Sequence, residues 1–160
     1  VEPYEVAVKV VDRTPWRFKQ NGFYAQQETP FDVGLSPDFD IPGPVKQGAT
    51  VYFTVAITNT TDRDLKVIYA RPEITISSSD PDEQINNGTI NAEPLRDIVI
   101  PGHNGSMVIT VPWVASAAGD YVVALTTPLP IRYEENGEKK TGSGMTGVFA
   151  NAMFPMTVKP

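Results

Sequence analysis

Residues 51–58 read Val51-Tyr52-Phe53-Thr54-Val55-Ala56-Ile57-Thr58, and this stretch decides the fold class. Its odd-numbered positions carry large apolar side chains, whereas its even-numbered positions are mostly small or hydroxylated. Side chains alternate between the two faces of a β-strand, so this two-residue period predicts a strand whose odd face points into a core. A strand covered on one side only is typical of a β-sandwich.

The same alternation recurs along most of the chain. No segment repeats apolar residues at helical spacing for more than one turn, so helix is not expected as a major element. Two Asn-Gly pairs, Asn21-Gly22 and Asn136-Gly137, predict two-residue hairpin turns. Further strands are predicted at residues 4–10, 65–71, 74–77, 107–111, 121–125 and 148–158.

Two stretches are expected to lie outside the strands. Residues 77–94 are polar, rich in turn formers and interrupted by Pro81 and Pro94, so we expect a surface excursion there. Gly142-Ser143-Gly144 is expected to be flexible, and it lacks the Gly-x-Ser-x-Gly spacing of a catalytic serine.

Length and charge exclude several classes of protein. The 160 residues suit one domain, 1–160, with residues 1–11 as a separate candidate strand for donation. A net charge of −6 argues against a nucleic-acid partner, because binding phosphates requires clustered Lys and Arg. No apolar stretch is long enough to span a bilayer, and without cysteine no disulfide is expected. Val1-Glu2-Pro3-Tyr4 has neither a basic region nor an initiator Met, so a mature, processed chain is expected.

Three Asn-x-Ser/Thr sequons begin at Asn59, Asn87 and Asn104. They are candidate glycosylation sites, and glycans on them would place the chain outside the cell. Ordinary turn chemistry is an equally good interpretation, because Asn is a common turn residue and Asn-Gly is a turn dipeptide.

The polar side chains show no catalytic or metal-binding pattern. His103 is the only histidine and lies in a turn, so a zinc, copper or Cys-His site is not expected. We therefore predict no enzyme activity, no cofactor and no metal residue. Oxygen-rich loops at Asp62-Arg63-Asp64 and Asp80-Pro81-Asp82-Glu83 leave Ca²⁺ open. The acidic pairs expected to be solvated are Asp38/Asp40, Asp80/Asp82/Glu83 and Glu134/Glu135.

Four aromatic residues allow two interpretations: Trp16, Tyr24, Trp113 and Tyr133. Aromatic faces with polar edges could form a platform for sugars. Aromatic residues on alternating strands more often belong to the core, and we favour that interpretation.

The central part of the chain resembles a known family of modules. The run from Gly48 through Asn59 to Val67, and the run from Pro101-Gly102 to Gly119-Asp120-Tyr121, resemble immunoglobulin-like modules of bacterial and archaeal surface proteins. The resemblance covers residues 45–127 and implies an all-β, Greek-key immunoglobulin-like sandwich, or a jelly-roll-like one. It also places Tyr121 where such sandwiches can carry a tyrosine corner, in which the hydroxyl bonds to backbone upstream. An ordinary core or half-buried tyrosine is at least as good an interpretation.

A second likeness concerns the apolar N-terminal strand and the size of the chain. Both are similar to camelysin-type biofilm-matrix fibres and archaeal bundling pili, and the likeness implies a subunit that lends a terminal strand to its neighbour. We therefore expect an extracellular or cell-surface structural subunit of a filament, pilus or matrix fibre, polymerising with copies of itself. The donor residues would be Tyr4, Val6, Val8 and Val10. The same strand could instead fold back into its own sheet, which is the commoner arrangement for a single domain. The alternative is a monomeric, surface-associated module that binds carbohydrate or protein without catalysis.

Overall fold

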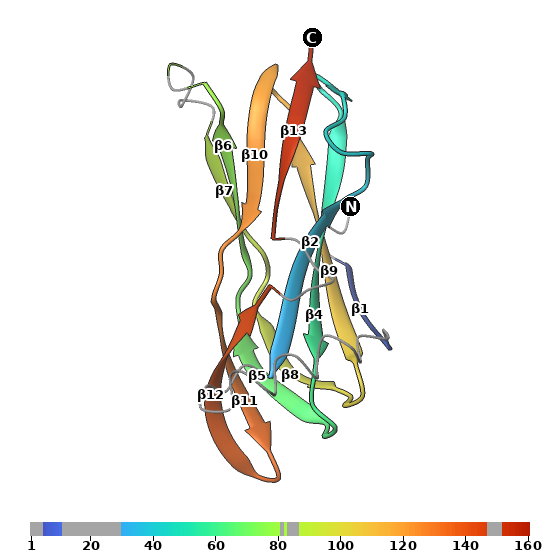
Figure 1. The fold of residues 1–160 in the computed structure, drawn as a ribbon, viewed down its shortest axis with the longest axis vertical. Helices are drawn as coiled ribbons and strands as arrows, with labels where there is room; N and C mark the ends of the chain where they lie inside the picture. The colour runs from blue at the N-terminus through green and yellow to red at the C-terminus, as the bar shows by residue number, and fades with distance from the viewer. Residues whose placement is uncertain (1–4, 11–29, 81, 83–86, 147–151) are drawn as a thin grey trace.

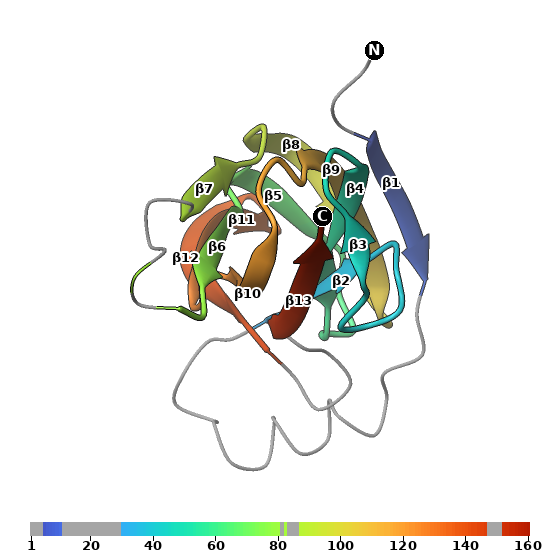
Figure 2. The same cartoon turned by 90° about the horizontal axis from the view of Figure 1, so that it is seen from above.

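The computed structural model describes residues 30–80, 82, 87–146 and 152–160, together with the backbone of residues 5–10. These ranges form thirteen strands in two sheets, and they contain no α-helix (Figure 1). The predicted all-β sandwich is therefore confirmed. Seen from above, the sheets curve around a common interior (Figure 2).

The larger sheet has eight strands in the order β1-β9-β4-β2-β12-β11-β5-β8. Neighbouring strands run antiparallel except β12 and β2, which pair in parallel at Phe31 and Asp32. β1 and β8 are its two edges. Its strands are β1 (Glu5–Val10), β9 (Gly105–Val114), β4 (Thr50–Asn59), β2 (Phe31–Pro37), β12 (Glu138–Met145), β11 (Leu129–Glu135), β5 (Leu65–Ala70) and β8 (Leu95–Ile100).

The smaller sheet has five strands in the order β3-β13-β10-β6-β7. Its pairs are antiparallel except β13 and β3, which run parallel. Its strands are β3 (Val45–Lys46), β13 (Met153–Lys159), β10 (Gly119–Leu125), β6 (Glu73–Ser78) and β7 (Gly88–Asn91).

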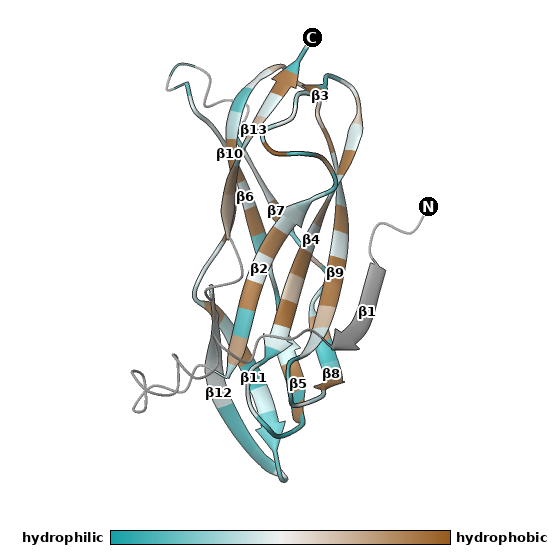
Figure 3. Cartoon of the chain, turned by 45° about the vertical axis from the view of Figure 1, so that its right-hand side comes forward, coloured by the Kyte–Doolittle hydropathy of each residue, from teal (hydrophilic) through white to brown (hydrophobic). Residues whose placement is uncertain are grey.

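The core lies between the sheets and is built from the residues that alternation predicts. In β4, Val51 is 5% exposed, and Phe53, Val55 and Ile57 are fully buried. Figure 3 shows apolar bands along β2, β4 and β9 in the same layer. Burying a side chain of this size contributes roughly 1.5–3 kcal/mol, so these positions fix which face of each strand turns inward.

The hairpin between β11 and β12 is confirmed. Asn136 and Gly137 have φ angles of 53° and 79°, the pair of positive values that a tight two-residue turn requires. The other predicted hairpin, at Asn21-Gly22, lies outside the described residues.

Two stretches that were expected to lie outside the strands contain strand residues, although most of the described residues between 77 and 94 are exposed as expected. β6 continues to Ser78, and residues 88–91 form β7, so the segment from 77 to 94 contains an edge strand. Gly142-Ser143-Gly144 belongs to β12 and is part of the sheet. A Cβ on Gly144 would lie 2.5 Å from Val33 Cγ1, so glycine at this position allows β12 to approach β2.

Candidate functional site

The predicted donor segment forms an edge strand, β1, and pairs with β9 of its own chain. The register sets Val6 opposite Ile109 and Val8 opposite Met107. Both β9 side chains are at most 1% exposed, so the apolar positions of β1 oppose the core-facing positions of β9. Tyr4 lies outside the described residues.

The ladder between β1 and β9 covers only part of β9. It runs from Gly105 to Thr110, whereas β9 itself continues to Val114. β4 pairs with β9 along nearly its whole length, from Thr50 opposite Val114 to Thr58 opposite Ser106. β1 is thus held on one side by six residue pairs, while β4 and β9 hold each other independently of it.

The opposite edge of the larger sheet, β8, is shaped differently. Asp97, in the middle of β8, has a φ of 55°, a left-handed conformation that a non-glycine residue seldom adopts. Its carboxylate lies 3.9 Å from Lys66 Nζ on β5. Irregular backbone and charge at an edge discourage another strand from pairing there, so the two edges differ in their suitability for strand addition.

Asn59 holds a turn, although its sequence motif made it a candidate glycosylation site. Its side chain is fully buried, and Nδ2 donates to the carbonyl oxygens of Arg63 at 2.7 Å and Ile100 at 2.9 Å. Its Oδ1 accepts from both the backbone N–H and the hydroxyl of Thr61. A glycan on Nδ2 would disrupt this arrangement, so the folded domain does not suit a glycan at Asn59.

The other two sequons differ from one another in exposure. Asn104 is 5% exposed and has a φ of 69° in the turn between β8 and β9, so it too is a buried turn residue. Asn87 is exposed, and its Oδ1 accepts from the N–H of Ser78 at 2.5 Å. Glycosylation at Asn87 stays a prediction that its exposure permits.

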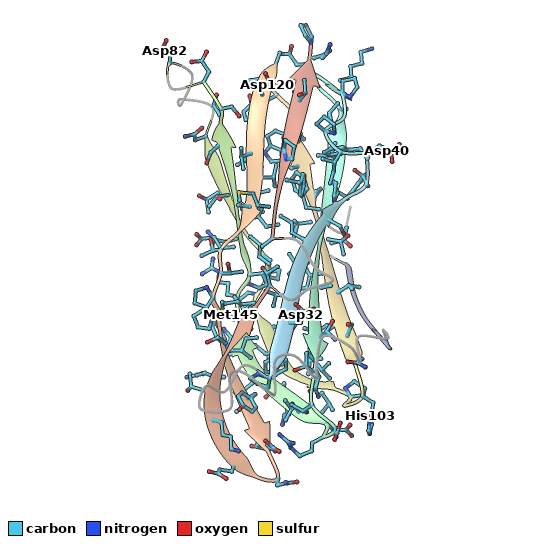
Figure 4. All side chains as sticks on the ribbon, in the orientation of Figure 1. Asp32, Asp40, Asp82, His103, Asp120 and Met145 are labelled. Atoms are coloured by element: carbon cyan, nitrogen blue, oxygen red, sulfur yellow. The ribbon has the colours of Figure 1, made fainter. Side chains whose placement is uncertain are left out.

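His103 is an exposed turn residue, as predicted. Its side chain is 77% exposed, and Nδ1 lies 4.0 Å from Asp62 Oδ1 (Figure 4). In the described ranges, no three His, Cys, Asp or Glu side chains lie close enough together to hold a metal ion.

The acidic pairs lie apart from one another, and most are solvated. Asp38, Asp40, Asp80 and Asp82 are exposed, and Figure 4 shows Asp40 and Asp82 at separate places on the surface. Glu134 is half-buried, and Glu83 lies outside the described residues.

Glu135 differs from the other carboxylates because it is buried in an ion cluster. Its side chain is 9% exposed and contacts Arg63 Nε and Lys140 Nζ. Burial raises the pKa of Glu135, but the hydrogen bonds and positive charges of its two neighbours outweigh burial, and the pKa is lowered overall. The cluster fastens the β11–β12 hairpin to the turn between β4 and β5.

The described aromatic residues support the core interpretation. Tyr133 is fully buried and meets Phe31 edge-on, with ring centroids 5.5 Å apart. Trp113 packs against Phe53 and Tyr121. The Tyr121 hydroxyl donates to the carbonyl oxygen four residues upstream at 2.9 Å, which confirms the tyrosine corner. The other two of the four aromatic residues named from the sequence, Trp16 and Tyr24, lie outside the described residues.

Comparisons with known proteins do not assign a family. No family model matches the chain, and no curated protein matches it in sequence. Solved structures with similar folds include a structural-genomics target protein with 11% identity and a TM-score of 0.49, covering 82% of this chain and 88% of that one.

Two further structures belong to named domain types. The ASH/PapD-like domain of human CEP192 has 13% identity and a TM-score of 0.37, covering 84% of this chain and 89% of that one. The CARDB domain of a Pyrococcus furiosus protein, in complex with di-metal ions, has 15% identity and a TM-score of 0.37, covering 83% and 91%. At these levels the likeness concerns the fold and carries no functional argument.

Where the structure describes the chain, no helix has the length and hydropathy needed to cross a membrane.

Proposed function

We propose that this chain is an extracellular structural subunit of a filament, pilus or matrix fibre, in which β1 of one subunit pairs with β9 of the next. The observation that carries the proposal is the position of β1. It is an edge strand, and among the described strands it pairs only with β9. β9 and β4 lie between it and β2, the next described strand in the chain.

The length of the connection between β1 and β2 supports exchange between copies. Twenty residues, 11–30, lie between the end of β1 and the start of β2. At ~3.3–3.6 Å per residue, a fully extended connection of this length spans at most about 65–70 Å, which is longer than a small domain. A strand on a connection of this length can reach the β9 edge of a neighbouring copy.

The energetics of exchange are compatible with the proposal. Pairing in trans makes the same backbone ladder with β9 as pairing within one chain, so strand exchange costs little interaction energy. Tyr4, Val6, Val8 and Val10 contribute roughly 1.5–3 kcal/mol each when buried, before the cost of ordering them. Without cysteine, no disulfide ties β1 to its own sheet. Protein concentration then decides between the two arrangements.

The difference between the two sheet edges supports an open polymer. If each subunit gives β1 and receives β1 at β9, the contact is head-to-tail and extends into a chain of subunits. The left-handed residue and the charges on β8 disfavour a second mode of strand addition, so growth would use a single seam.

A cysteine cross-link tests the proposal directly, because the natural chain has no cysteine. Ala7 and Val108 are register partners on β1 and β9, so we would replace both with cysteine. After assembly at high concentration and oxidation, we expect a ladder of covalent multimers on non-reducing denaturing gels. Electron microscopy of the same sample should show filaments.

The matched control pairs two strands that the proposal leaves within one chain. Thr54 on β4 and Thr110 on β9 are register partners with hydroxyl oxygens 3.2 Å apart, and their double cysteine variant should give only monomeric bands. If Ala7→Cys/Val108→Cys also gives only cross-linked monomer at every concentration, β1 stays in its own sheet and the filament proposal fails. The monomeric binding module would then be the better interpretation.

A further inference from the structure

A row of three side chains crosses adjacent strands of the larger sheet: Arg96 on β8, Tyr69 on β5 and Arg132 on β11. Tyr69 is the register partner of both arginines. Arg96 Cζ lies 4.9 Å and Arg132 Cζ 5.6 Å from the centre of the Tyr69 ring. We call this set the Arg-Tyr-Arg row.

The row lies on the outer face of the sheet. Ala70 and Ile131, which follow Tyr69 and precede Arg132, are fully buried, and side chains of adjacent strand residues point to opposite faces. Both arginines are exposed, whereas Tyr69 is half-buried. The ring therefore forms the base on which the two guanidinium groups rest.

Neither guanidinium group is neutralised by the described part of the protein. Among the described residues, the ion pairs involve other basic side chains, and no carboxylate lies within 4.0 Å of Arg96 or Arg132. The chain as a whole has 19 acidic and 13 basic residues. Carboxylates therefore outnumber basic side chains, and a shortage of carboxylates does not explain why these two arginines have no ion pair within the described ranges.

A third exposed arginine adds to this charge. Arg71 follows β5 two positions after Tyr69 and forms no ion pair with the described residues. Lys66 and Lys139 lie on the same group of strands but have carboxylates beside them, Asp97 at 3.9 Å and Glu134 as a register partner. The excess positive charge is therefore concentrated on the arginines.

The geometry of the row indicates the class of ligand. A guanidinium group binds carboxylate or sulfate oxygens in a two-pronged manner, and the ring beneath it reduces the entropy that binding costs. Arg96 Cζ and Arg132 Cζ lie 4.9 Å and 5.6 Å from the same ring centre, so the two guanidinium groups are at most about 10.5 Å apart, the sum of these distances, and one polymer chain can contact both. The net charge of −6 disfavours nucleic acid, whose duplex carries one charge per ~1.7 Å, and favours a polymer with sparser negative charges.

We infer that the Arg-Tyr-Arg row is a binding site for a linear acidic polysaccharide, with Arg96 and Arg132 each holding a carboxylate or sulfate group. Tyr69 would hold the two guanidinium groups in place, and the sugar units that link the two charges would pass beside it. The site does not depend on filament assembly, because β1 and β9 take no part in it.

Titration calorimetry of the full chain tests the inference. The probes are alginate as the carboxylate polymer, chondroitin sulfate as the sulfated polymer, dextran as the neutral polymer, and single-stranded DNA. We expect saturable binding of one or both acidic polysaccharides, weakened by salt, with no binding of dextran. The stronger of the two identifies the anionic group. Failure of both polysaccharides to bind, or tighter binding of DNA, would overturn the inference.

Two double variants with equal charge loss locate the site. Arg96→Gln/Arg132→Gln should weaken binding at least about tenfold, since each substitution removes charged hydrogen bonds. Lys46→Gln/Lys159→Gln removes two positive charges from register partners on the other sheet and should change affinity less than twofold. Equal losses in both variants would show non-specific attraction and refute a site at the row.

A separate pair of variants tests whether the Tyr69 ring contributes to binding. Tyr69→Phe keeps the aromatic face and should bind within about twofold of the natural chain, whereas Tyr69→Leu should weaken binding severalfold although both arginines remain. Melting curves of both variants establish that they are folded. Unchanged binding by Tyr69→Leu would remove the ring from the site.

Discussion

Replacing Asn59 with aspartate is expected to destabilise the domain far more than its small chemical change suggests. Aspartate keeps the Oδ1 acceptor that Thr61 uses, but it exchanges the Nδ2 donor for a second oxygen. That oxygen would face the carbonyl oxygens of Arg63 and Ile100, which Nδ2 approaches at 2.7 Å and 2.9 Å.

The size of the effect can be worked out bond by bond. A buried acceptor that loses its partner costs ~1–3 kcal/mol, and the Ile100 carbonyl lies in buried surroundings, whereas the Arg63 carbonyl is partly exposed. Taking the upper part of this range for Ile100 and the lower part for Arg63 gives a loss of about 3–4 kcal/mol. A typical domain has a free energy of unfolding of ~5–15 kcal/mol, so the loss would be a large fraction of the total.

Urea unfolding followed by tryptophan fluorescence measures this loss, because Trp113 packs against Phe53 in the core. The control is Asn87→Asp in the exposed sequon, where Oδ1 still accepts from Ser78, and it should change stability by less than about 0.5 kcal/mol. If Asn59→Asp is as stable as this control, the hydrogen bonds of Asn59 do not hold the turn and our reasoning is wrong.

Three other substitutions have definite expected outcomes. Glu135→Gln should lower stability by about 1 kcal/mol at neutral pH. Because folding lowers the pKa of Glu135, its stabilisation is present above the unfolded value of 4.5 and is lost as pH falls through the folded pKa. Urea unfolding of both proteins at several pH values measures this. A variant that is still less stable than the natural chain in acid would contradict it. Tyr121→Phe removes the hydroxyl donor of the tyrosine corner and should cost about 1–2 kcal/mol, so an unchanged melting temperature would count against the corner. Gly102→Ala would place Cβ 2.7 Å from the backbone of the β4–β5 turn and should lower the free energy of unfolding by about 1–3 kcal/mol in denaturant unfolding. The control, Gly88→Ala, has open space around its Cβ and should lose little stability. Equal losses in the two variants would contradict the close approach at Gly102.

Alternation predicted the core strands because one face of each is buried and the other is not. In β13, Phe154, Met156 and Val158 are all at most 4% exposed, and their inward positions follow from the two-residue period alone. The hairpin at Asn136-Gly137 was predictable for another local reason, since Asn-Gly accepts two positive φ angles at little cost.

Strands that depart from this pattern were missed. In β2, Asp32 is 1% exposed and Gly34 is also buried, so both faces are covered and a polar residue no longer marks the solvent side. β7 fails in the opposite way, because its residues are mostly exposed and its place at the sheet edge depends on pairing with β6. In both strands the deciding contacts come from parts of the chain far away in sequence.

The polar sites depend even more on strand order. Tyr69, Arg96 and Arg132 are separated by dozens of residues, and only the order β11-β5-β8 brings them together. Asn59 shows the limit of a local motif, since Asn-Thr-Thr is both a sequon and the sequence of its turn. Burial distinguishes the two, and burial is a property of the whole fold.

The pairing of β1 with β9 also affects the order of events during synthesis. Glu5 pairs with Thr110, so β1 leaves the ribosome about a hundred residues before its partner strand β9. At ~5–20 residues per second, this delay is about 5–20 s. During that interval β1 has no β9 from its own chain, and a completed neighbour could already offer one.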